Sequence, residues 1–322
     1  MSIRISLLLW LLVALLFAAS LLTPWATLSS LFHQDRGLAL AVLNELRLPR
    51  ALLALAYGAT LGVSGAAVQA LFANPLASPD LTGTTSGAAL GAVLTAYIFG
   101  FTAPIALSLG AIGGALGALL LLLLLAGPRA ETATLLLAGL AISALAGALT
   151  TLALALAPSP FAFYDAYEWL MGSLIDRSLS QAAFAGVPAL AAILLLLRLG
   201  GALDALTLGE EVAQSFGHDV ARLRLAVVCL SAAGVGACVA ICGAIGFVGL
   251  VAPIFARRLT GGHPGRALLP AGLIGGGLLL AADLAVRLAP LGRTLPIGVV
   301  TALLGAPFFL WLVVHMRWRL AR

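Results

Sequence analysis

Residues 47–87 read RLPRALLALAYGATLGVSGAAVQALFANPLASPDLTGTTSG, and this stretch decides how the chain is built. Residues 52–79 contain no charged side chain, which exceeds the roughly 20 apolar residues that a membrane-spanning helix needs. From Gln69 to Gly87 the pattern is interrupted by two prolines and by Asp80. Irregular backbone at membrane depth is tolerated only where protein covers it or a cavity adjoins it. The stretch therefore predicts a membrane helix followed by a break that lines a pathway or, alternatively, forms a simple cytoplasmic turn.

The composition extends this interpretation to the whole chain. Of the 322 residues 62% are hydrophobic and only 9% are charged, whereas about a quarter are charged in soluble proteins. The short alternating segments of an outer-membrane barrel do not occur. We expect an all-α, polytopic membrane protein that forms one transmembrane domain over residues 1–322. The ten predicted spans are 5–28, 50–72, 81–99, 104–126, 132–155, 182–199, 226–243, 245–258, 268–288 and 296–315.

The basic residues predict the orientation of these helices. All seventeen are arginines, and segments on the cytoplasmic side of a membrane carry the excess of Lys and Arg. If the N-terminus is inside, eleven arginines fall in inner segments and six in outer segments. We therefore expect both termini in the cytoplasm, which requires an even number of spans.

The sequence lacks the residues of several catalytic sites. Without a lysine the chain cannot form a P-loop, so another chain must hydrolyse ATP if the protein uses it. No HExxH or GxSxG motif occurs, and the histidines are scattered. The three cysteines (Cys229, Cys238 and Cys242) are interpreted as small buried side chains rather than metal ligands. We expect a transporter in membrane lipid that binds no cofactor and no nucleic acid.

Two loops are long enough to carry structure of their own. Residues 156–181 are aromatic and sparsely charged, which predicts an interfacial helix at about 160–180 on the outer side. Residues 200–225 are the most polar stretch and predict two short cytoplasmic helices. In the second of these, Glu210 and Glu211 occupy the first turn and Gly217 ends the helix. Such a polar elbow is suited to contact another protein.

Charged residues at the predicted outer ends of spans form a further group. Arg47, Arg50 and Arg287 are either interfacial anchors or a cationic patch that docks an acidic partner. Asp283 is the one acid deep in a late span, and such acids are usually functional. It can act in proton coupling, or it can pair with Arg287 four residues on.

Six stretches together resemble the FecCD permease family. They are RLPRALLALAYGATLGVSGAAVQALFANPLASPDLTGTTSGAALGAV from 47, TLLLAGLAISAL from 134, LGEEVAQSFGHDVARLRL from 208, GAIGFVGLVAP from 243, LLPAGLIGGGLLLAADLAVRL from 268 and LPIGVVTALLGAPFFLWL from 295. The resemblance covers nearly the whole chain. It implies the membrane subunit of a type II ABC importer in a bacterial inner membrane, with ten helices and a fold like that of the vitamin B12 permease. The implied partners are a second permease subunit, two cytoplasmic ATPase subunits that bind ATP-Mg, and a periplasmic binding protein.

The resemblance also implies roles for individual residues. Arg47, Arg50 and Arg287 match arginines that meet glutamates of the binding protein. Asn74 and Leu76 match the cytoplasmic gate loop, and Thr132 and Ala133 match a second gate position, where Ala133 departs from the hydroxyl pair of the vitamin B12 permease. Gln69, which begins the broken segment 69–87, is a further pathway residue predicted from the sequence pattern. The coupling helix that enters the ATPase matches Leu208, Gly209, Glu210, Glu211, Ser215 and Gly217.

Three hypotheses follow from the sequence. The first is an ATP-driven importer of an iron chelate (ferric siderophore or haem) or of cobalamin, most simply as a homodimer. The second is a proton-coupled secondary transporter that uses Asp283, although such a protein has no need of the polar elbow at 200–225. The third is an intramembrane enzyme, which the missing catalytic residues disfavour.

Overall fold

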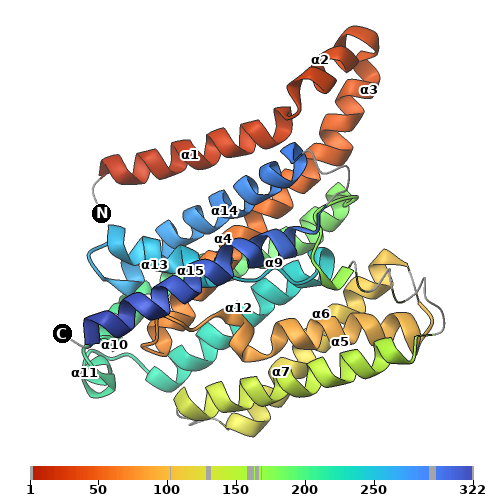
Figure 1. Cartoon of the computed structure of the whole chain (residues 1–322). Coiled ribbons are helices and arrows are strands. Elements are labelled where there is room, and N and C mark those ends of the chain that lie inside the picture. The colour runs from red at the N-terminus through yellow and green to blue at the C-terminus, as the bar shows by residue number, and fades with distance from the viewer. Residues whose placement is uncertain are drawn as a thin grey trace.

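The computed structural model describes residues 3–101, 103–127, 132–157, 163, 167, 169–289 and 295–320. Within these ranges the regular structure is helical, which confirms the predicted all-α fold (Figure 1). The helices are α1 (Ile3–Leu22), α2 (Trp25–Gln34), α3 (Arg36–Ala41), the π-helix η1 (Val42–Arg47), α4 (Leu48–Leu71), the 3-10 helix η2 (Pro79–Thr82), α5 (Thr84–Tyr97), α6 (Pro104–Ala126), α7 (Thr132–Ala155), α9 (Leu179–Arg198), α10 (Gly200–Leu206), α11 (Glu210–Ser215), α12 (Val220–Cys242), α13 (Val248–Leu259), α14 (Pro264–Leu288) and α15 (Ile297–Leu320).

Seven of the described helical stretches are long and apolar enough to cross a membrane. α15 is apolar over Ile297–Phe308. α5 and α13, with 14 and 12 residues, are shorter than the predicted spans 81–99 and 245–258. At about 1.5 Å per residue neither crosses the roughly 30 Å hydrocarbon core alone. Both follow irregular segments, 72–78 before η2 and 243–247 before α13, so the chain leaves helical structure ahead of each of them. The count of ten spans stays a prediction.

The second predicted span, 50–72, is wrong at its start. Helical structure runs without interruption from Arg36 to Leu71 through α3, η1 and α4. Asp35 caps its beginning, because its Oδ1 accepts from the Gly37 N–H at 2.8 Å. The prediction placed the start of this span at Arg50, the last residue of the RLPR motif. Instead a π-helical stretch precedes Pro49 and accommodates it inside a longer helix.

Of the predicted interfacial helix at 160–180, residues 160–162, 164–166 and 168 fall outside the described residues, and 163, 167, 169 and 170 are helical. Over 171–178, which are described, no helix forms. The Ser173 N–H donates to the Cys242 carbonyl at 2.7 Å, and the Ile297 N–H donates to the Gly172 carbonyl at 3.1 Å. This segment therefore packs against the end of α12 and the start of α15, and its place relative to the membrane surface stays a prediction.

α4 and α14 lie side by side through the middle of the molecule, with their backbones in direct contact (Figure 1). A Cβ atom on Gly58 would overlap the carbonyl of Gly275, and one on Gly62 would overlap the carbonyl of Ala271. At Gly65 the backbone of Gly249, in α13, is equally close. In lipid, where helices gain little from hydrophobic burial, such small-residue contacts are a main source of helix association.

α5 and α6 form a second close pair. Gly87 and Gly91 on α5 face Gly114 and Gly110 on α6, again with no room for a side chain. Gly113 and Gly117 of α6 meet nothing within 4 Å. The position of a glycine on its helix face therefore decides whether it serves packing.

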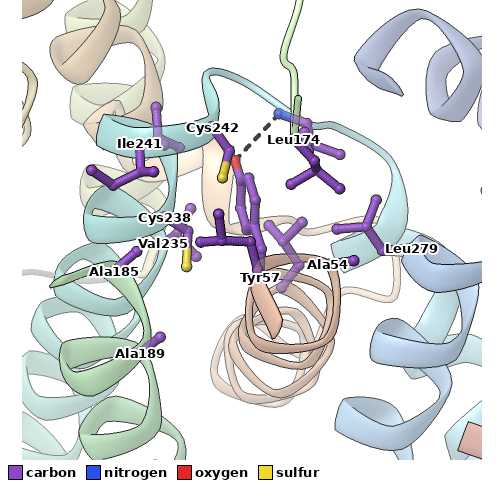
Figure 2. Close-up of a cluster of buried hydrophobic side chains, with 14 of the residues drawn as sticks. Ala54, Tyr57, Leu174, Ala185, Ala189, Val235, Cys238, Ile241, Cys242 and Leu279 are labelled. Atoms are coloured by element: carbon purple, nitrogen blue, oxygen red, sulfur yellow. Dashed lines mark hydrogen bonds between the residues drawn. The ribbon is translucent and has the colours of Figure 1, made fainter. Parts of the chain in front are cut away.

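Tyr57 connects α4 to the break before α13. Figure 2 shows its ring between α12 side chains such as Val235 and Cys238 and the α14 residue Leu279. Its hydroxyl donates to the Gly243 carbonyl at 3.1 Å and accepts from the Ile245 N–H at 3.3 Å. Backbone groups that the break removes from a helix are thus satisfied inside the protein.

The glycine contacts generate a stability prediction. Gly62→Ala should lower the thermal unfolding temperature of the purified protein, because the added Cβ forces α4 and α14 apart, and overpacking typically costs about 1–3 kcal/mol. Gly113→Ala is the matched control, since its Cβ meets open space. Fluorescence-detected size-exclusion after heating measures both. Equal melting temperatures for the two variants would contradict the packing account.

Candidate functional site

Two of the three outer arginines, Arg50 and Arg287, meet at one carboxylate. Arg50, on α4, approaches Oδ1 of Asp283 with Nε and NH2, each at 2.8 Å. Arg287 forms an ion pair with Oδ2 of the same residue through NH2. Asp283 is 1% exposed, whereas the side chains of Arg50 and Arg287 are 18% and 10% exposed. The predicted i,i+4 pair is confirmed, and a second pair joins α4 to α14.

Arg287 and Arg47 also reach the end of α1. Arg287 NH1 donates to the Ser20 carbonyl at 2.7 Å, and its NH2 donates to the Ser20 hydroxyl at 3.2 Å. Arg47 NH1 donates to the Leu21 carbonyl at 2.9 Å. These carbonyls belong to the last turn of α1, where no intrahelical donor is available.

The arrangement favours one of the two interpretations of Asp283. Both of its oxygens lie in ion pairs, and almost none of its surface meets solvent. We therefore interpret Asp283 as the counter-ion of the cluster rather than a proton carrier. Sequence reasoning missed the pair with Arg50, because the two residues are 233 positions apart and only the packing of α4 on α14 brings them together.

The predicted gate residues Asn74 and Leu76 lie in the turn that follows α4. Asn74 Oδ1 accepts from the Leu76 N–H at 2.9 Å, and the Asn74 carbonyl accepts from the Ala77 N–H at 3.1 Å. Gln69, fully buried in the last turns of α4, donates from Nε2 to the Leu250 carbonyl of α13 at 3.3 Å. This hydrogen bond therefore joins the end of α4, which leads into the turn, to α13.

The rest of this segment packs against the middle of α7. A Cβ on Gly83 would press against Ile142, and the Ser143 hydroxyl reaches the Asp80 carbonyl at 3.5 Å. Thr85 donates to Asp80 Oδ1 at 2.8 Å. The second predicted gate position, Thr132 and Ala133, lies at the start of α7, about three helical turns before these contacts. Ala133 is exposed, and the side chain of Thr132 is not among those that the structure describes.

The polar elbow consists of the two short helices α10 and α11, as predicted. Gly209, with φ 105°, precedes α11, and Glu210 and Glu211 occupy its first turn. Gly217, with φ 83°, follows it, and the His218 N–H closes the end by donating to the Ala213 carbonyl at 3.1 Å. Glu210 pairs with Arg224 of α12 at 2.6 Å, which holds α11 against the start of α12.

One face of the elbow is apolar and exposed. Leu208, Val212 and Phe216 recur every fourth residue, and Phe216 is 65% exposed. Side chains four apart share a helix face. The sequence prediction named Leu208 and Ser215 but missed Val212 and Phe216, although their spacing was visible. The Ser215 hydroxyl bonds only locally, to the Val212 carbonyl at 2.7 Å.

The elbow is attached to the first turn of α14. Asp204 Oδ1, on α10, accepts from the Gly265 N–H at 2.8 Å. The Gly265 backbone lies so close to the Gly200 carbonyl that a Cβ would not fit. A movement of α10 therefore acts directly on α14.

An open cavity of about 540 Å³ separates the elbow from the end of α4. Its walls include Leu206 and Glu210 on one side, Gln69 and Phe72 on the other, and Arg257 of α13. The described residues contain no group of three or more His, Cys, Asp or Glu that could hold a metal ion.

Comparison with known proteins assigns the chain to a protein family. The family model described as the FecCD transport family matches residues 6–315. The chain belongs to the FecCD transport family. This confirms the resemblance that its sequence motifs carry.

Individual relatives agree with this assignment. The vitamin B12 import system permease protein BtuC of Vibrio cholerae is 41% identical over 305 residues, which cover 91% of this chain and 87% of the relative. The achromobactin transport system permease protein CbrC of Dickeya dadantii is 38% identical, over 98% of this chain and 92% of the relative. A solved structure of a metal-chelate type ABC transporter in an inward-facing conformation has a TM-score of 0.86 at 34% identity and covers 97% of this chain and 99% of the solved chain.

The arginine cluster generates a second prediction. Asp283→Ala leaves two largely buried guanidinium groups without their counter-ion, and breaking a buried pair in this way costs about 3–5 kcal/mol. Arg222→Ala is the control, because it removes an exposed pair with Asp219 but leaves the Asp219 cap of α12 in place, and such exposed pairs contribute about 0–1 kcal/mol. Thermal unfolding in detergent should show a large loss of stability for the first variant only. A similar small loss in both would mean that the cluster is solvated in solution.

Proposed function

We propose that this chain is the membrane-spanning permease subunit of an ATP-driven ABC importer. Two copies form the pathway, two cytoplasmic ATPase subunits bind ATP-Mg, and a periplasmic binding protein delivers the cargo. The observation that carries the proposal is the exposed apolar surface around α11. Val212 of the helix, Phe216 at its C-terminal cap and Leu208 just before it are uncovered, and such a surface outside the membrane is suited to enter a groove of another protein. Membership of the FecCD transport family supports it.

The same assignment orients the molecule. We place α10 and α11 in the cytoplasm, together with the first turn of α1 and the last turn of α15, which lie at the same end (Figure 1). The arginine cluster then lies at the periplasmic end. It contains three guanidinium groups and one carboxylate, an excess of two positive charges that an acidic binding protein would neutralise.

The cytoplasmic gate is proposed to be the turn after α4. Asn74 and Leu76, with Gln69 behind them, form one side, and Thr132 and Ala133 at the start of α7 form the other. The cavity of about 540 Å³ between elbow and turn gives the elbow room to move when ATPase subunits close. A shift of α10 or α11 would change this cavity and act on the end of α4.

The cargo is proposed to be a large metal chelate. The relatives are named for vitamin B12 and for achromobactin, and the solved structure belongs to a metal-chelate type transporter. An iron chelate, as a ferric siderophore or haem, and cobalamin are therefore the candidates. The binding protein selects among them.

A transport assay tests this function. Proteoliposomes that contain the chain, an ATPase partner and a binding protein should take up a ferric siderophore or cobalamin only with ATP. Uptake should stop with vanadate and continue with a protonophore, because ATP rather than a proton gradient supplies the energy. Uptake without the ATPase, or its collapse under the protonophore, would contradict the proposal and favour proton coupling.

The coupling role of α11 is tested separately. Phe216→Ala should weaken binding of the ATPase subunit roughly 30-fold, the effect of losing an interface anchor worth about 2 kcal/mol. Phe99→Ala is the matched control, because Phe99 is also 65% exposed and follows α5 at the opposite end of the molecule. Pull-down of the ATPase by the purified variants measures both. Equal retention of the ATPase by the two variants would show that α11 is not part of the interface with the ATPase.

A further inference from the structure

A second open pocket, of about 230 Å³, lies beside the elbow, where three membrane helices end. Its apolar walls belong to the last turn of α6, the first turn of α7 and the first turns of α12, whereas its charged residues belong to α12 alone. The residues that matter here are Leu123, Leu135, Leu225, Val228, Arg222 and Arg224. The pocket therefore combines an apolar wall with two arginines.

The charged and the apolar residues lie at different depths. α6, α7 and α12 are each long and apolar enough to cross a membrane, so their ends mark its boundary. Arg222 belongs to the first turn of α12, and Val228 follows six residues later, about 9 Å further along the helix. The pocket thus presents positive charge at the level of lipid headgroups and apolar walls at the level of acyl chains.

The two arginines differ in what they can still bind. Arg224 has a side chain that is 12% exposed, and its NH2 pairs with Glu210 at 2.6 Å. The side chain of Arg222 is 88% exposed, and its Nε lies 3.1 Å from Oδ2 of Asp219. Within the part of the chain that the structure describes, the two terminal nitrogens of Arg222 have no partner. Arg222 can therefore bind a phosphate and keep its contact with Asp219.

The surroundings of the pocket favour lipid as its occupant. Leu124 and Leu125 of α6 and Leu137 of α7 are close in sequence to the wall residues, and all three are more than half exposed. α7 lies at the edge of the molecule opposite α1 (Figure 1). Lipid tails are as apolar as leucine, so exposed leucines at membrane depth meet acyl chains unless another chain covers them.

We propose that this pocket binds one anionic phospholipid of the inner leaflet, with its phosphate on Arg222 and an acyl chain against Leu123, Leu135 and Val228. Basic pockets between membrane helices on the cytoplasmic side are suited to anionic headgroups, which the negatively charged surface of that leaflet supplies. The leaflet follows from the proposed orientation, whereas neither the cargo nor the ATPase enters the inference. Because Arg224 lines the pocket and holds Glu210 of α11, the bound lipid lies next to the contact that fixes the elbow.

The first test measures the headgroup contact. The purified chain in detergent is titrated with phosphatidylglycerol or with phosphatidylethanolamine, and bound lipid is counted by native mass spectrometry. One phosphatidylglycerol should bind with a Kd at least fivefold below that of phosphatidylethanolamine. Arg222→Ala should abolish this preference, and Arg258→Ala, which removes an exposed arginine of α13 outside the pocket, should preserve it. Equal Kd values for the two lipids in the unaltered chain, or an unchanged preference in Arg222→Ala, would overturn the proposal.

The second test measures the acyl-chain contact. Leu225→Trp places an indole in the pocket and should raise the Kd for phosphatidylglycerol several-fold. Leu194→Trp is the matched control, because Leu194 of α9 is exposed to a similar extent and lies outside the pocket. Equal Kd values for the two variants would show that lipid meets Arg222 without entering the pocket, and would overturn the site as described.

A third measurement separates lipid from the proposed ATPase partner. The complex of the chain with the ATPase should retain the phosphatidylglycerol, and Arg222→Ala should bind the ATPase as well as the unaltered chain does. Loss of the lipid on assembly, together with weaker ATPase binding by Arg222→Ala, would mean that the ATPase covers the pocket. The lipid site would then be wrong while the proposed function stands. Uptake that needs no ATPase would contradict the proposed function and leave the lipid titrations unaffected.

Discussion

The direct contact between the backbones of α4 and α14 is the constraint on which the rest of this structure depends. Gly58 and Gly62 on one helix meet Gly275 and Ala271 on the other with no space for a further atom. In lipid the hydrophobic effect does not press helices together, so this fit and the ion pairs at its end must hold the pair. Two long helices are thereby joined into one unit that runs from one end of the molecule to the other.

Both candidate functional regions are attached to that unit. At one end, Arg50 of α4 and Asp283 of α14 form the ion pair of the arginine cluster. At the other end, α4 leads into the turn at Asn74, and Gly265 of α14 holds the elbow through Asp204. If a binding protein docks at the arginine cluster as proposed, a signal from it has a continuous, closely packed route to the elbow. The cavity beside the elbow is where the structure leaves room for movement.

The sequence predicted the helical membrane fold, the break after α4 and the elbow, because proline, glycine and charge mark these features locally. Gly217, for example, was predicted to end the short helix that Glu210 and Glu211 begin, because glycine is common just after a helix end. What it did not predict depends on contacts between distant segments. The pairing of Arg50 with Asp283 exists only once α4 packs on α14, and the early start at Arg36 depends on a π-helical stretch that accommodates Pro49. The apolar face with Phe216 was missed although its spacing was local.

The central claim is that α4 and α14 move as one body during transport. Spin labels at two exposed positions, Leu52 on α4 and Leu278 on α14, would report the distance between the helices in a variant whose native cysteines are replaced. The account predicts the same distance distribution in the nucleotide-free transporter and in the complex trapped with ATP and vanadate. A shift of several ångströms between the two states would show that the helices separate, and would contradict the claim.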